Sequence, residues 1–97
     1  MRMMMRVQVT VEKGNEAMQN GKLMEVIKQT MERIKPEAAY FGPFEGKRTG
    51  YFFFNLTDQT QLPPIADPLF KELHAEIVCV PVLNAEDLQK GFAMIGR

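Results

Sequence analysis

The chain has 97 residues, a length that supports one domain with a single modest core. Twelve Lys and Arg residues balance twelve Asp and Glu residues, so the formal net charge is zero and the surface lacks the positive excess that follows nucleic-acid phosphates. The longest apolar run, Ile77 to Leu83, is far short of the ~20 residues that cross a bilayer. The first residues lack the apolar region of a secretory signal. We therefore expect one cytoplasmic domain over residues 1–97, with neither nucleic acid nor a membrane as partner.

The N-terminal third predicts a strand followed by a helix. Apolar and polar residues alternate from Met5 to Val11, as in a half-buried strand, while the methionine-rich residues 1–4 are left open to disorder or to an alternative start. After Gly21 an apolar stripe recurs at helical spacing. Its members are Met24, Ile27, Met31 and Ile34. The residue before a proline leaves the α region, so the helix should end at Lys35.

Residues 38–44 and 48–56 predict a β-hairpin, because both are strand-like and a short glycine-containing loop, residues 45–47, joins them. The second strand is apolar on both of its faces. Tyr51 and Phe53 point one way, and the residues that point the other way are Phe52, Phe54 and Leu56. A strand of this kind needs cover on each side of the sheet.

The remaining chain predicts a helix capped by Asp58 or Thr60 and broken at Pro68, one further helical turn, and a last strand over residues 75–83. Asn84 should cap a C-terminal helix. Asp87 lies three residues further on, where a carboxylate favours the positive helix end.

This order is β-α-β-β-α-β plus a C-terminal helix, which is typical of the ferredoxin-like α+β fold with a four-stranded antiparallel sheet. Right-handed crossovers place the first and third strands in the centre and the other two at the edges. Proline cannot donate to a sheet ladder, and Pro43 and Pro81 both fall in strands expected at the edges.

Helices on one face of such a sheet leave its other face uncovered. That face would carry Gln8, Thr10, Tyr51 and Phe53, a set too apolar for water and too polar for an ordinary core. A two-fold dimer joins identical patches, which suits this surface. We therefore expect a homodimer.

Two regions resemble a known family. Asp67-Pro68-Leu69-Phe70, leading through His74 into residues 76–78, is similar to the region before the last strand of muconolactone isomerases, and residues 35–41 and 46–50 resemble a small bacterial branch of the same superfamily. With the element order, residues 5–83 thus resemble the dimeric α+β barrel superfamily, in which two ferredoxin-like protomers pack sheet to sheet. The resemblance implies that fold and a dimer. Members include isomerases, cofactor-independent monooxygenases, haem-degrading monooxygenases and proteins that only bind ligands.

No cofactor or metal is expected. Residues 70–74 are similar to the segment that carries the haem-ligating histidine of the haem-degrading branch, which would map onto His74. That branch also uses a tryptophan and a first-strand asparagine, whereas this chain has no tryptophan and offers Gln8 and Thr10. The chain lacks the Cys and His pairs of structural zinc sites. The one cysteine, Cys79, lies in an apolar run and predicts an inert thiol.

The candidate catalytic residues are His74 and Glu76. Histidine is the residue type best suited to proton transfer near pH 7, and a carboxylate two residues away shares its face if residue 74 is extended. The same histidine is also explained as a boundary residue between helix and strand. Arg48 is the candidate for binding a carboxylate, although a turn arginine exposed to solvent is the commoner case. The other candidate ligand-binding residues are Tyr40, Tyr51, Phe52 and Phe54, with Met24 beside them.

Two functions fit these residues. In the first, the protein binds a small apolar or aromatic ligand between sheet and helices or within the barrel, and His74, Glu76 and Arg48 form the polar end. The resemblance then implies an isomerase or a cofactor-independent monooxygenase. In the second, the protein is a non-catalytic binding or assembly module and its aromatic residues only fill core and interface. Gly42, Gly46 and Gly50 indicate turns and nothing more.

Overall fold

The computed structural model describes residues 1–96 as an α+β protein, and Arg97 lies outside the described residues. In chain order the elements are β1 (Arg2–Val9), α1 (Val11–Gln19), α2 (Lys22–Ile34), β2 (Ala38–Phe44), β3 (Lys47–Asn55), the 3-10 helix η1 (Gln59–Gln61), α3 (Leu62–Leu73), β4 (Glu76–Pro81) and α4 (Ala85–Ile95). The four strands form one antiparallel sheet, as predicted. The element order differs from the predicted one because α1 is an additional helix.

The strands lie in the order β2-β3-β1-β4. The first and third strands are therefore central and the second and fourth are edges, as expected. Pro43 lies in β2 and Pro81 is the last residue of β4. Each proline thus occupies an edge strand, where the missing N–H donor costs little.

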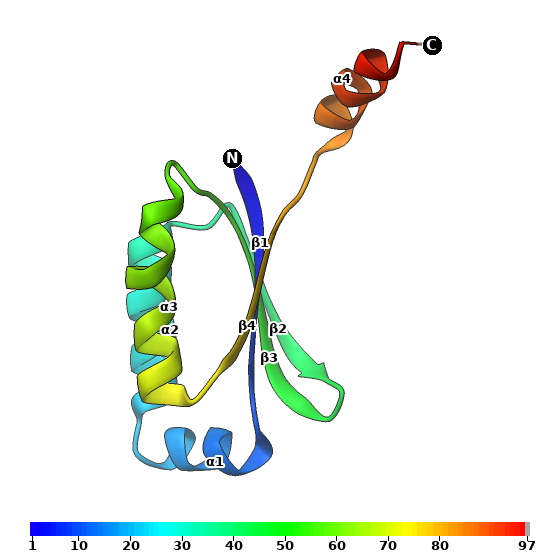
Figure 1. The fold of residues 1–97 in the computed structure, drawn as a ribbon. Coiled ribbons are helices and arrows are strands. Elements are labelled where there is room, and N and C mark those ends of the chain that lie inside the picture. Colours follow the sequence, from blue (N-terminus) through cyan, green and yellow to red (C-terminus); the bar gives the residue numbers. More distant parts are fainter. Residues whose placement is uncertain (97) are drawn as a thin grey trace.

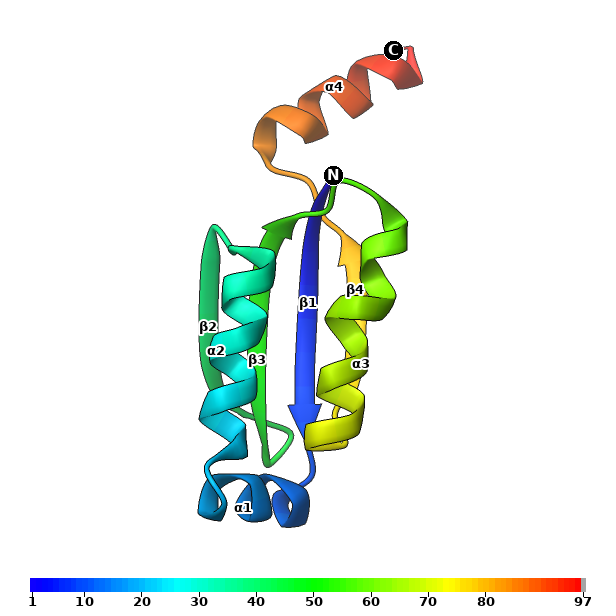
Figure 2. The same ribbon diagram turned by 90° about the vertical axis from the view of Figure 1, so that its left-hand side faces the viewer.

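Helices α2 and α3 cover one face of the sheet and leave the other without helical cover (Figure 1). Seen onto the helical layer, α2 lies over β2 and β3, and α3 lies beside it over the opposite part of the sheet (Figure 2). The core fills the space between this layer and the sheet. Its most deeply buried large side chains are Met5, Phe52, Phe54, Leu69 and Leu73.

The N-terminal segment differs from its prediction. Strand β1 begins at Arg2, so residues 2–4 are part of the sheet, and Met3 is buried in the core. The strand ends at Val9 because Thr10 caps α1, its hydroxyl accepting a hydrogen bond of 3.2 Å from the Lys13 N–H. Threonine is a favoured helix cap, and the alternating pattern concealed this change of structure. Thr10 therefore does not lie on the uncovered sheet face.

Helix α2 turns a different side to the core than predicted. Met24 is 65% exposed, and Ile27 and Met31 are only partly buried against the core. The buried residues of this helix are Leu23, Val26, Thr30 and Ile34. The polar Thr30 is acceptable there because its hydroxyl donates to the Val26 carbonyl at 2.8 Å. A pattern that counts only apolar residues misses that position, so the predicted stripe was displaced around the helix.

In the hairpin, β3 carries apolar side chains on both of its faces, as predicted. Glu45 and Gly46 form its turn with φ values of 57° and 76°, and a two-residue loop with both φ values positive matches the twist of the flanking strands. Phe52 pairs with Met5 on the core side. Tyr51 pairs with Arg6 on the uncovered side and is half-buried.

Pro68 does not break α3. Asp58 caps the preceding 3-10 turn, and α3 then continues through Pro68 to Leu73. An internal proline costs about 3 kcal/mol, partly because one hydrogen bond to the preceding turn is lost. Burial of Ile65, Leu69 and Leu73 on one side of the helix offsets this cost.

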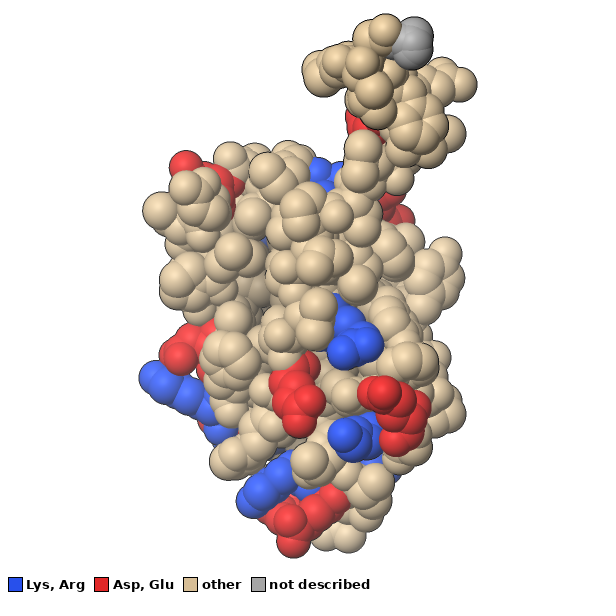
Figure 3. Space-filling view, turned by 45° about the vertical axis from the view of Figure 1, so that its right-hand side comes forward, with Lys and Arg blue, Asp and Glu red and all other residues tan. Residues whose placement is uncertain are grey.

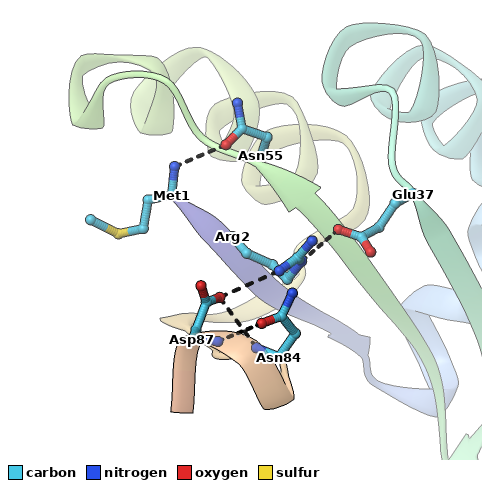
Figure 4. A network of polar contacts seen from close by, with 6 residues as sticks. All are labelled: Met1, Arg2, Glu37, Asn55, Asn84 and Asp87. Carbon is cyan, nitrogen blue, oxygen red and sulfur yellow. Dashed lines mark hydrogen bonds and ion pairs between the residues drawn. The ribbon is translucent and has the colours of Figure 1, made fainter. Parts of the chain in front are cut away.

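Helix α4 projects beyond the end of the sheet (Figure 1), and the molecule is elongated, with extents of 55 × 28 × 17 Å. Asn84 and Asp87 form the predicted cap, now seen as a reciprocal pair of hydrogen bonds. Arg2 connects α4 to the sheet: its Nε donates to Glu37 at 2.8 Å and its Nη1 lies 3.5 Å from Asp87 (Figure 4). The hydrogen bond to Glu37 raises the pKa of the Arg2 guanidinium, with smaller contributions from the nearby carboxylate charges.

The observed orientation of α2 can be tested with variants of two adjacent residues. Leu23→Ala should lower the free energy of unfolding by about 2–5 kcal/mol, because it leaves a cavity in the core. Met24→Ala should change it by less than about 0.5 kcal/mol, because that side chain is largely in water. Urea denaturation of both variants measures the difference. Equal losses would contradict the observed orientation, and a larger loss for Met24→Ala would support the predicted stripe.

Candidate functional site

A hollow of about 380 Å³ lies between the helical layer and the sheet, lined by residues of α2, α3 and all strands but β4. We call it the α2–β2 pocket. Its apolar walls include Val7 and Val9 of β1, Leu23, Met24 and Ile27 of α2, and Phe41 of β2. Phe52 of β3 with Leu69 and Leu73 of α3 closes the inner side. Hollows on the outer surfaces of α2 and α3 are more open to solvent.

Gly50 makes room for one wall of this pocket. It lies in the middle of β3, opposite Phe41 in the register of the two strands. A Cβ atom at Gly50 would lie 3.2 Å from the Phe41 ring and 3.1 Å from the Phe52 ring. Without that atom, Phe41 packs edge to face against Phe52 with ring centroids 5.6 Å apart. Gly50 is thus a packing residue within a strand, and the prediction that it marks a turn was wrong.

Arg48 is the charged residue among those that line the pocket. It lies at the start of β3, is exposed, and donates from Nη1 to the Asn15 Oδ1 of α1 at 3.0 Å. Gly14 allows this approach, because a Cβ atom there would be only 3.0 Å from Nη1. Helix α1, absent from the prediction, therefore holds the arginine at one end of the pocket.

The structure brings together three of the residues proposed for the ligand site. Arg48, Phe52 and Met24 all line the α2–β2 pocket. Phe54 is buried in the core instead, opposite Met3. Tyr40 and Tyr51 face each other across β2 and β3 on the uncovered side of the sheet. These two tyrosines therefore belong to the surface that the predicted barrel would enclose.

His74 and Glu76 lie outside the lining of the pocket. His74 ends α3 with a left-handed φ of 53°, its N–H donating to the Phe70 carbonyl at 3.0 Å. Histidine is one of the residues enriched in that backbone region. The expected pairing of the two side chains required an extended residue 74, and this condition is not met. Glu76 is an exposed residue of β4, opposite Gln8 on the uncovered face.

Cys79 is partly buried against the core, and burial raises the pKa of its thiol. A higher pKa leaves less thiolate at neutral pH, which agrees with the predicted inert role. Within residues 1–96, no group of three His, Cys, Asp or Glu side chains is placed to hold a metal ion. None of the helices described for the chain has both the length and the apolar character needed to cross a bilayer.

Sequence reasoning did not place Phe41, Gly42 or Gly50 in the site, although all three line the pocket. Glycine in the middle of a strand signals close approach of another group, and Gly50 lies between Thr49 and Tyr51 in a run of strand formers. This signal predicts that a side chain of the neighbouring strand packs over Gly50. Which residue of that strand lies opposite Gly50 depends on the hairpin register, which a two-residue turn sets.

Comparisons of the chain with protein-family models, with curated proteins and with solved structures found no match.

The role of Gly50 can be tested by adding one methyl group. Gly50→Ala should lower the free energy of unfolding by about 1–3 kcal/mol, because the new Cβ displaces Phe41 and Phe52. Gly42→Ala is the matched control: it lines the same pocket, but its Cβ would meet nothing within 4 Å. It should be neutral or slightly stabilising. Thermal and urea denaturation would measure both, and equal effects would contradict the packing role.

Proposed function

We propose that this protein binds a small apolar or aromatic molecule in the α2–β2 pocket. The observation that carries the proposal is the hollow of about 380 Å³ with apolar walls and one charged residue. Ligand pockets are typically ~300–1,000 Å³ and combine apolar walls with a few polar groups. Water in such a hollow makes few hydrogen bonds with its walls, so an apolar ligand that replaces it gains free energy.

The walls of the pocket can fit small ligands of different shapes. Met24 is an unbranched and largely exposed side chain on α2, and methionine adapts its shape to what it contacts. Phe41, also exposed, offers an aromatic face on the other side of the opening. Phe52 beneath them is buried in the core.

Binding without chemistry is better supported than catalysis. His74 lies at a helix end outside the pocket lining, and Arg48, which cannot serve as a general acid or base near neutral pH, is the charged group inside it. An isomerase or cofactor-independent monooxygenase activity that uses His74 and Glu76 stays a prediction from the sequence. The alternative of a purely assembling module has the uncovered sheet face in its favour.

Binding can be measured with a neutral fluorescent probe, 2-naphthalenemethanol, because the chain contains no tryptophan to obscure its emission. The parent protein should bind it and shift its emission. Ile27→Phe should weaken binding by about tenfold, equivalent to ~1.4 kcal/mol, because the larger ring fills part of the pocket.

The matched control is Met31→Phe, one turn further along α2, partly buried like Ile27 but outside the pocket. It should bind the probe like the parent. His74→Ala in the same assay should also retain the affinity, and a loss in a folded variant would return His74 to the site. A parent protein that binds neither this alcohol nor a negatively charged probe of the same shape would refute the proposed function.

We further propose that the fold is ferredoxin-like and that two copies pack as a dimeric α+β barrel. The strand order and the single helical layer support the first part. The uncovered face supports the second: it carries Met4, Phe53, Val78 and Val80 around the polar Arg6. Seen from this side, the upper part of the face and α4 are largely uncharged, and most charged residues gather toward the lower end (Figure 3).

The size of the surface supports a second copy that also covers α4. Four strands of six to nine residues give a face of about 26 by 19 Å, or roughly 500 Å². A stable interface buries ~800 Å² on each partner. One side of α4, which carries the exposed Leu88 and Phe92, adds roughly 250 Å². Arg6 and Glu76 give this face charges of both signs, which suits contact between two identical patches.

Sedimentation at micromolar concentration should therefore give about twice the chain mass of 11.1 kDa. Tyr51→Glu should give monomers or unfolded protein, because burial of an unpaired carboxylate costs several kcal/mol. Met24→Glu introduces the same charge on the exposed side of α2 and should remain dimeric. A parent protein that sediments as a monomer would rule out the barrel.

A further inference from the structure

The walls of the α2–β2 pocket are almost entirely apolar, and the charged residue that lines it, the exposed Arg48, has no counter-charge among the described residues. Among residues 1–96, the ion pairs of the structure involve Arg2, Lys13, Lys22 and Lys71, and none involves Arg48. Its hydrogen-bond partner is the neutral amide oxygen of Asn15. A guanidinium has five N–H donors in a planar fork, so most of them remain open to another acceptor.

We propose that the ligand of the α2–β2 pocket is an apolar or aromatic carboxylic acid, bound as its anion. This inference rests on the proposed function and names the ligand class. The ring or chain would lie among Val7, Leu23 and Phe52, and the carboxylate would bind Arg48 at the exposed end. Planar carboxylates match the guanidinium fork with two parallel hydrogen bonds.

The charge of the pocket favours a single negative charge on the ligand. One guanidinium balances one carboxylate, and the surrounding walls are apolar side chains that cannot solvate a second charge. Asn15 holds Arg48 by one N–H in the absence of ligand, so the guanidinium is positioned before the ligand arrives. Because Arg48 is exposed, its charge stays hydrated when the pocket is empty.

The direct test compares two probes of the same shape with the parent protein. 2-Naphthoate carries the carboxylate, and 2-naphthalenemethanol carries a neutral hydroxymethyl group in its place. The naphthoate should bind about tenfold more tightly, the usual size of a charge-assisted hydrogen-bond effect. Raising the ionic strength should weaken naphthoate binding and leave the alcohol unchanged, because Arg48 is exposed to the salt.

Variants then assign the difference to Arg48. Arg48→Met should abolish the preference for naphthoate and retain alcohol binding, whereas Arg48→Lys should keep part of it, because lysine preserves the charge but loses the fork. Lys47→Met is the matched control: it removes a neighbouring positive charge from the other side of β3, opposite Phe44. It should keep the preference. Circular dichroism and thermal unfolding establish that each variant is folded.

The outcomes separate this inference from the proposed function. Equal affinity of the parent for the two probes would overturn the carboxylate and leave an apolar binding site. A preference that survives in folded Arg48→Met would also overturn it. If the parent binds neither probe, the proposed function fails first.

Discussion

A single layer of two helices covers one face of the sheet, and one of its two central strands, β3, is apolar on both faces. Phe52 and Phe54 of β3 are buried beneath that layer, while Tyr51 and Phe53 lie on the side that it leaves open. Burial of the first pair beneath α2 and α3 stabilises the fold, since apolar area removed from water contributes ~25 cal/mol per Å². Edge strand β2 has no fully buried residue, and the α2–β2 pocket lies between it and α2.

Much of the fold was accessible from local pattern. Alternation and the glycine turn indicated four strands, and right-handed crossovers, supported by the two prolines, predicted which strands are central and which are edges. The pattern failed where the position of a polar residue is set by its own hydrogen bonds. Thr30 is buried because it satisfies its own hydroxyl within α2, and Thr10 caps α1 although it continues an alternating run. Both depend on hydrogen bonds of a single side chain, which a count of apolar residues does not register.

The site was harder to predict than the fold. Arg48, Phe52 and Met24 were candidates by residue type, and they do line one pocket. Phe41 was missed because its importance arises from the missing Cβ of Gly50 in the facing strand. His74 and Glu76 were paired on the assumption of extended backbone, and the left-handed His74 that ends α3 separates them from the pocket. Residue type identified candidates, but backbone conformation and strand register decided which of them meet.

Helix α4 raises a separate question of stability. It has 11 residues, and isolated helices below about 12–15 residues are marginal in water. The Asn84 cap fixes where it begins, and the contact of Asp87 with Arg2 connects its first turn to β1. Neither contact buries its apolar side, on which Leu88 and Phe92 are exposed. A surface packed against this apolar side would stabilise the helix, and in the proposed dimer the second copy, packed on the open face toward which α4 leans (Figure 1), would supply it.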